Sequence, residues 1–161
     1  MRASRKPEGL YPPGEQPDAK LVGMLKKGTP SRIQRGMAMD GGGGGMMGGG
    51  GGGIERLTID GRTFDAARTD QRARLGAVEE WTVENPTAMD HPFHLHVWPF
   101  VVLDGGGAPV IPGGRKDTVN VPAGSAVRFR VAYTDFGGRT VYHCHILDHE
   151  DQGMMGVIDV R

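Results

Sequence analysis

The chain has 161 residues, a formal net charge of zero and a single cysteine. This length allows one domain with a moderate hydrophobic core. The neutral charge gives no electrostatic reason to expect nucleic-acid binding, one cysteine excludes an internal disulfide framework, and no apolar run reaches the roughly 18 to 20 residues of a membrane helix.

The first third of the chain, residues 1–53, is predicted to be a disordered or linker segment. Residues 1–36 carry eight Lys or Arg against three Asp or Glu and show little apolar periodicity, which is typical of a solvated tail. Residues 41–53 contain eleven glycines around Met46 and Met47, a composition that cannot pack and indicates a flexible coil.

From residue 54 onward, short segments of alternating apolar and polar residues are separated by Gly and Pro turns. Trp81 and Val83, for example, are expected on one face of a half-buried strand. Residues 64–75 are polar, with several arginines in and near the segment, which favours a solvated face. Strands are predicted at residues 57–59, 76–84, 94–103, 118–121, 125–133, 139–145 and 155–160. Short strands without helical periodicity predict an all-β sandwich for residues 54–161.

The six histidines fall into two clusters, one in the sequence HPFHLH and one in HCHILDH. In the first, His94 and His96 are two residues apart and are expected on the same face of a strand. His91 precedes Pro92, which has no N–H for a strand ladder and therefore suits the start of a strand.

The second cluster surrounds Cys144, the only cysteine, in a segment rich in β-forming residues. Because side chains alternate across a strand, His143 and His145 are expected on one face and Cys144 on the other. The chain is then expected to return His149 toward the cysteine through a loop or one helical turn at residues 145–150. Gly153 would give the backbone the freedom to bring Met154 to the same place.

The thiolate of cysteine, the imidazole of histidine and the thioether of methionine are soft or borderline metal ligands. Two His, one Cys and a weak axial Met form the blue, electron-transferring type of copper site. The first expected group therefore contains His91, Cys144, His149 and Met154. The remaining histidines form a separate imidazole group: His94, His96, His143 and His145.

The two motifs resemble the C-terminal cupredoxin domain of the multicopper oxidases, the laccase family. The resemblance covers roughly residues 54–161 and implies a Greek-key cupredoxin fold. It assigns His91, Cys144, His149 and Met154 to a type 1 copper, and it assigns the imidazole group to a trinuclear copper cluster. The family takes its other cluster histidines from two further His-x-His motifs in an N-terminal domain, and no histidine of this sequence lies outside the two clusters described above.

The resemblance implies an oxidase that takes electrons from a small reducing substrate (a phenol, an amine or a metal ion) and reduces dioxygen to water. Cys144, His143 and His145 would form the electron path. Asp148 and Glu150 are candidate proton relays. A second cupredoxin domain is the expected partner. The family suggests a periplasmic or extracellular location, although no signal peptide is visible at the start of this chain.

Other interpretations remain open at this stage. A small type 1 copper electron carrier would need only the first group, and four further histidines would have no role in it. Copper sequestration without catalysis is a third hypothesis. Zinc also binds Cys and His, but its structural sites favour closed tetrahedral sets. Met37, Met39, Met46 and Met47 could recruit Cu(I) through soft thioethers, or could simply belong to a linker.

Overall fold

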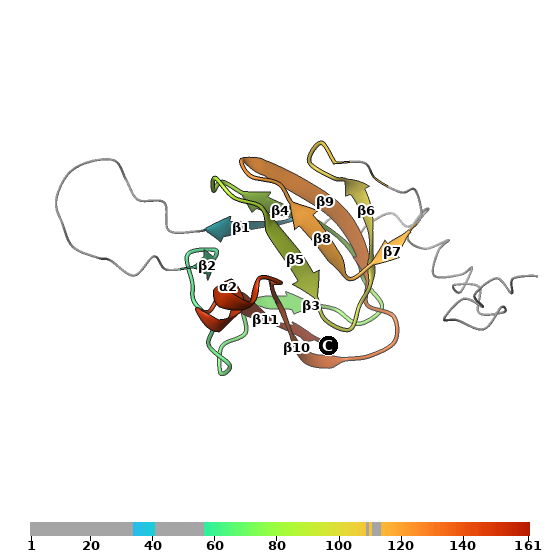
Figure 1. Ribbon diagram of the computed structural model, residues 1–161. Coiled ribbons are helices and arrows are strands. Elements are labelled where there is room, and N and C mark those ends of the chain that lie inside the picture. Colours follow the sequence, from blue (N-terminus) through green and yellow to red (C-terminus); the bar gives the residue numbers. More distant parts are fainter. Residues whose placement is uncertain (1–33, 41–56, 109, 111–113) are drawn as a thin grey trace, which may run out of the picture.

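The computed structural model describes residues 34–40, 57–108, 110 and 114–161 (Figure 1). Within these residues the chain forms strands and one short helix, with the bounds β1 Gln34–Asp40, β2 Thr58–Ile59, β3 Gln71–Ala73, β4 Val78–Asn85, β5 His91–Leu95, β6 Phe100–Asp104, β7 Arg115–Lys116, β8 Thr118–Val121, β9 Ser125–Ala132, β10 Gly138–Cys144, α2 Leu147–Asp151 and β11 Met155–Val160.

The strands form two sheets. One has the order β2-β1-β4-β9-β6-β7 and the other the order β3-β11-β10-β5-β8. Most neighbours are antiparallel, but β1 runs parallel to β4 and β3 runs parallel to β11. The predicted all-β sandwich is confirmed, and α2 is a short turn of helix beside β10 (Figure 1).

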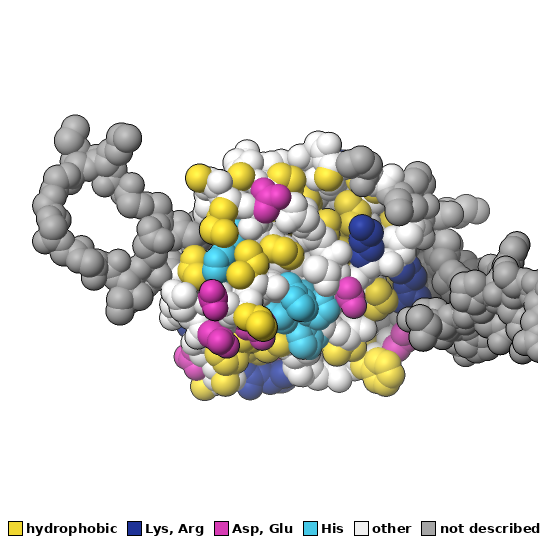
Figure 2. Space-filling model, in the orientation of Figure 1, with side chains coloured by type: hydrophobic (Ala, Val, Ile, Leu, Met, Phe, Trp, Pro, Cys, Tyr) yellow, Lys and Arg dark blue, Asp and Glu magenta, His cyan; other side chains and the backbone are white. Residues whose placement is uncertain are grey.

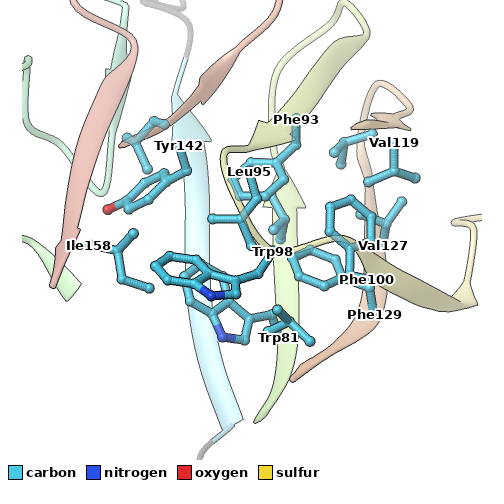
Figure 3. Packing of buried hydrophobic residues seen from close by; sticks show 14 of the residues in the cluster. Trp81, Phe93, Leu95, Trp98, Phe100, Val119, Val127, Phe129, Tyr142 and Ile158 are labelled. Atoms are coloured by element: carbon cyan, nitrogen blue, oxygen red, sulfur yellow. The ribbon is translucent and has the colours of Figure 1, made fainter. Parts of the chain in front are cut away.

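The core lies between the two sheets (Figure 3). Trp81 of β4 is fully buried, with its ring centroid 6.4 Å from that of Phe93 in the opposite sheet and 6.0 Å from that of Tyr142. Burying side chains of this size contributes about 1.5–3 kcal/mol each. On the outer face of the same strand, Glu80 pairs with Arg128 and Arg130 across the sheet. The alternation in the sequence thus predicted which side chains of β4 face the core and which face the solvent.

The expected continuous strand at residues 94–103 is wrong. The chain turns after His96, where Val97 has a φ of 74° and the Trp98 N–H donates to the His96 carbonyl at 2.9 Å. This three-residue turn separates β5, in the five-stranded sheet, from β6, in the six-stranded sheet. Residues 97–103 form an unbroken apolar run, so no change of period marks the turn in the sequence.

The expected linker at residues 1–53 also needs correction. Residues 34–40 form β1, which pairs with β4 over five residues and with β2 over two. The rest of that segment lies outside the described residues. Within the expected solvated face, residues 71–73 form β3 against β11. Backbone hydrogen bonds attach β1 to β4 and β3 to β11. Polar or mixed sequences can also make such bonds, so no apolar pattern marks these two strands.

Candidate metal centres

The register between β5 and β10 brings the two histidine motifs together. Cys144 lies opposite Phe93, and His143 lies opposite His94. Side chains alternate, so Cys144 turns into the buried core while its neighbour His143 turns to the other face. One pair of adjacent strands therefore presents donor atoms on both of its faces.

The first donor group is buried. The Cys144 Sγ atom lies 3.6 Å from Nδ1 of His91 and 3.5 Å from Nδ1 of His149, and the two Nδ1 atoms are 3.2 Å apart. Cys144 and His91 are fully buried, and His149 is 8% exposed. Three potential ligand atoms thus converge on one point that the surrounding protein shields from water.

Backbone hydrogen bonds bring Met154 beside this group. The Cys144 N–H donates to the Met154 carbonyl at 3.0 Å, and the Met154 N–H donates to the His149 carbonyl at 2.9 Å. The Met154 side chain is fully buried in the same core cluster as Cys144. Gly153 permits this close return: its φ is 97°, and a Cβ there would lie 3.2 Å from the Thr63 side chain.

The second donor group is the imidazole set, which is partly accessible: His145 is exposed and His94 and His96 are half-buried, whereas His143 is only 4% exposed. Nε2 of His96 lies 2.9 Å from Nε2 of His143, and donor atoms of His94, His96 and His143 lie within 4.8 Å of one another. His145 is exposed at the margin of the set, with its ring centroid 5.4 Å from that of His94. Figure 2 shows histidine side chains gathered on one face of the molecule, with acidic side chains nearby.

Neighbouring oxygen atoms hold two of these rings. His94 Nδ1 lies 3.0 Å from the Asp117 carbonyl and 2.9 Å from the Thr118 hydroxyl. His143 Nδ1 lies 2.9 Å from the Cys144 carbonyl and 3.3 Å from a Glu150 carboxylate oxygen. A proton on Nδ1 directed at a carbonyl leaves the Nε2 lone pair for a metal. Sequence reasoning missed Thr118, because a hydroxyl at this spacing carries no distinctive signal.

Burial also shifts the pKa of several of the donor groups. It lowers the pKa of His91, His94 and His96, and neighbouring histidines lower it further. Burial raises the pKa of the Cys144 thiol, with Glu150 adding to the effect. Neutral imidazole is the form that ligates a metal, and a bound metal ion deprotonates a coordinating thiol.

The donor set fits copper. One sulfur and two imidazole nitrogens in an enclosed apolar site, beside a buried thioether residue, match the ligand types of a blue copper centre. A structural zinc site would instead use four strong ligands in a closed tetrahedron. His91, Cys144 and His149 are the residues that would hold the copper, with Met154 beside them.

The family model described as Multicopper oxidase matches residues 34–161. The chain belongs to the multicopper oxidase family. Membership gives it a cupredoxin-type β-sandwich, implies copper as its cofactor and places it among oxidoreductases. In the part of the chain that the structure describes, no helix is both long and apolar enough to span a membrane.

Among curated relatives, multicopper oxidase mco of Staphylococcus haemolyticus is 39% identical over 112 residues, covering 66% of this chain and 25% of the relative. The laccase of Bacillus subtilis strain 168 is 36% identical over 107 residues, covering 54% of this chain and 21% of the relative. The chain thus spans about a quarter of the length of these multicopper oxidases.

Solved structures of the family superpose on the chain. The laccase from Pediococcus acidilactici Pa5930 gives a TM-score of 0.66 at 34% identity, over 84% of this chain and 27% of that protein. A multicopper oxidase from Campylobacter jejuni, described as a metallo-oxidase, gives 0.66 at 34% identity, over 82% and 31%. A laccase-like enzyme from Ochrobactrum sp., with oxidase activity towards lignin model compounds, gives 0.63 at 26% identity, over 99% and 35%.

Proposed function

We propose that this chain is the domain of a multicopper oxidase that holds the type 1 copper and contributes half of the trinuclear cluster. Copper in these two places would supply one-electron uptake from a reducing substrate at the type 1 site and reduction of dioxygen to water at the cluster. The type 1 ligands would be His91, Cys144, His149 and Met154. The cluster ligands would be His94, His96, His143 and His145.

The observation that carries the proposal is that β10 contributes one residue to each donor group. Cys144 belongs to the buried group, and its sequence neighbour His143 belongs to the imidazole group. The backbone that joins Cys144 to His143 and His145 is therefore a short covalent path between the two groups. A small electron carrier would have no use for this second group.

Glu150 is the better placed of the two candidate proton relays. A carboxylate oxygen of Glu150 lies 3.3 Å from His143 Nδ1, at the edge of the imidazole group, and the side chain is partly exposed. It can therefore exchange protons with water and stay beside the cluster ligands. Asp148 is exposed on the first turn of α2.

Several classes of reducing substrate are candidates. Related enzymes are described both as a metallo-oxidase and as active on lignin model compounds, so a metal ion and a phenolic compound are both candidates, with an amine as a third. The partner would be another cupredoxin domain with its own His-x-His motifs. A periplasmic or extracellular location rests on the family resemblance alone.

Two variants test the assignment of the two groups. Cys144→Ser removes the thiolate, whose bond to copper gives a blue site its intense colour, so it should abolish the visible absorption. His145→Ala should keep that colour, because His145 lies in the imidazole group. Metal analysis with visible and EPR spectra of the copper-loaded chain measures both. A Cys144→Ser variant that stayed blue would contradict the type 1 assignment, and copper content that no imidazole variant changed would favour the small electron carrier.

A further inference from the structure

A hydroxyl group lies against the far side of the His91 ring. Thr87, in the loop between β4 and β5, places its Oγ1 atom 2.9 Å from His91 Nε2. The opposite ring nitrogen, Nδ1, is the one that faces Cys144 and His149. Thr87 therefore touches a proposed copper ligand at the atom that does not face the metal position.

Asn85 places an acceptor oxygen beside the Thr87 hydroxyl. It is 1% exposed, and its Nδ2 group donates to the Met89 carbonyl at 2.7 Å and to the Val121 carbonyl at 2.9 Å. Those two acceptors fix the orientation of the amide, so its Oδ1 atom can only accept. It accepts from the Thr87 N–H at 3.0 Å and lies 2.7 Å from Thr87 Oγ1.

The Thr87 hydroxyl has one proton to donate, and its nearest partners other than His91 are acceptors. These are Asn85 Oδ1 and the Met89 carbonyl, the latter at 3.0 Å. Whichever of them takes the proton, a lone pair of Oγ1 is left to face His91 Nε2. With the hydroxyl proton on either of these oxygens, the neutral His91 ring carries its proton on Nε2, which leaves the Nδ1 lone pair facing Cys144 Sγ and His149 Nδ1.

We propose that Asn85 and Thr87 act as positioning residues for the type 1 copper, by fixing the tautomer and the orientation of His91 before the metal arrives. This inference rests on the proposed function of the buried group. A ligand imidazole that donates its other N–H to an acceptor is a stronger base toward the metal. The Thr87 contact should therefore stabilise Cu(II) more than Cu(I).

Thr87→Val tests the inference, because valine keeps the shape of threonine and removes the hydroxyl. In the copper-loaded chain we expect Cu(II) binding to weaken about tenfold to hundredfold, Cu(I) binding to weaken less, and the reduction potential to rise accordingly. Thr87→Ser, which keeps the hydroxyl, should restore both affinities. Thr82→Val, a half-buried threonine on β4, is the matched control and should change neither. Equal Cu(II) and Cu(I) losses in Thr87→Val would show a merely structural role and overturn the proposal.

A measurement on the metal-free chain separates this inference from the proposed function. Ring ¹⁵N chemical shifts report which nitrogen of neutral His91 carries the proton. Wild type should show the proton on Nε2, and Thr87→Val should show a mixture of tautomers. A wild-type proton on Nδ1 would overturn the inference even if the chain bound a blue copper. A wild-type chain that never became blue would instead refute the proposed function and leave the tautomer result standing.

Discussion

Val97 adopts a backbone conformation that β-branched residues avoid. Its φ of 74° lies in the left-handed region, where the Cβ atom crowds the backbone. The turn it occupies ends the strand that carries His94 and lets Trp98 enter the core. Strain of about 1–3 kcal/mol at such a residue persists only where the surroundings impose it. Here the surroundings are the imidazole group on one side and the core on the other.

Val97→Gly should stabilise the metal-free chain by about 1 kcal/mol, because glycine adopts this φ without strain. Val97 is 55% exposed, so little apolar burial is lost. Val97→Ala is the matched control: it keeps a Cβ atom and most of the strain, and should gain less than glycine. Urea unfolding of the three chains measures the difference. A Val97→Gly chain less stable than wild type would show that the turn is not strained.

At the scale of elements, Asp70 lengthens the pairing between β3 and β11. Its N–H donates to the Val157 carbonyl at 2.9 Å, and its side-chain Oδ2 accepts from the Val157 N–H at 2.8 Å. The carboxylate thus stands in for a backbone carbonyl just before β3 begins. It also pairs with Arg68, which bonds in turn to the Thr63 carbonyl.

Asp70→Ala should lower the free energy of unfolding by about 1–3 kcal/mol, because the Val157 N–H loses its acceptor in a partly buried place. Asp135→Ala, at an exposed position in the loop before β10, is the control and should change stability little. Urea unfolding of the metal-free chains provides the measurement. Equal stability of the two variants would show that water replaces the carboxylate and that the edge of the sheet does not need it.

Elements could be predicted from the sequence where burial follows the period of a strand. β9 alternates and β11 is mostly apolar, and their predicted bounds differ from the observed ones by at most one residue. β3 and β7 are two or three residues long and largely polar, so only the backbone of a neighbour defines them. The turn at Val97 could not be predicted because it begins an unbroken apolar run, residues 97–103, in which no period is visible.

Some residues of the candidate site could be predicted from the sequence, and others could not. Cysteine and histidine are uncommon enough that their spacing, with the alternation of side chains along a strand, predicted which of them would meet around Cys144 and around His143. The residues that hold the rings could not be predicted. Thr87 and Thr118 carry common hydroxyl groups. Thr87 lies beside His91 because of how the loop before β5 folds, and Thr118 lies beside His94 because the two residues are partners in the pairing of β8 with β5. Assignment of the two groups as type 1 and cluster ligands stays a prediction.

At the scale of the whole molecule, the two donor groups differ in how complete they are. The buried group has all of its expected residues, His91, Cys144, His149 and Met154, within one sandwich. The imidazole group lies partly open on one face (Figure 2). The family resemblance implies twice as many histidines around three coppers, and every histidine of this chain already belongs to one of the two groups.

We therefore expect the isolated 161-residue chain to bind one copper tightly and become blue, yet to leave dioxygen unreduced. Four imidazoles on an accessible face cannot enclose three coppers, so any further copper should bind weakly and be removed by a chelator. Oxygen consumption with an easily oxidised donor should stay at background until an N-terminal domain of the family, with its own His-x-His motifs, is added. That domain alone, and the same mixture made with His145→Ala, serve as controls and should remain inactive. Sustained oxygen uptake by the isolated, copper-loaded chain would contradict this expectation, and would indicate that copies of the chain complete one another's clusters.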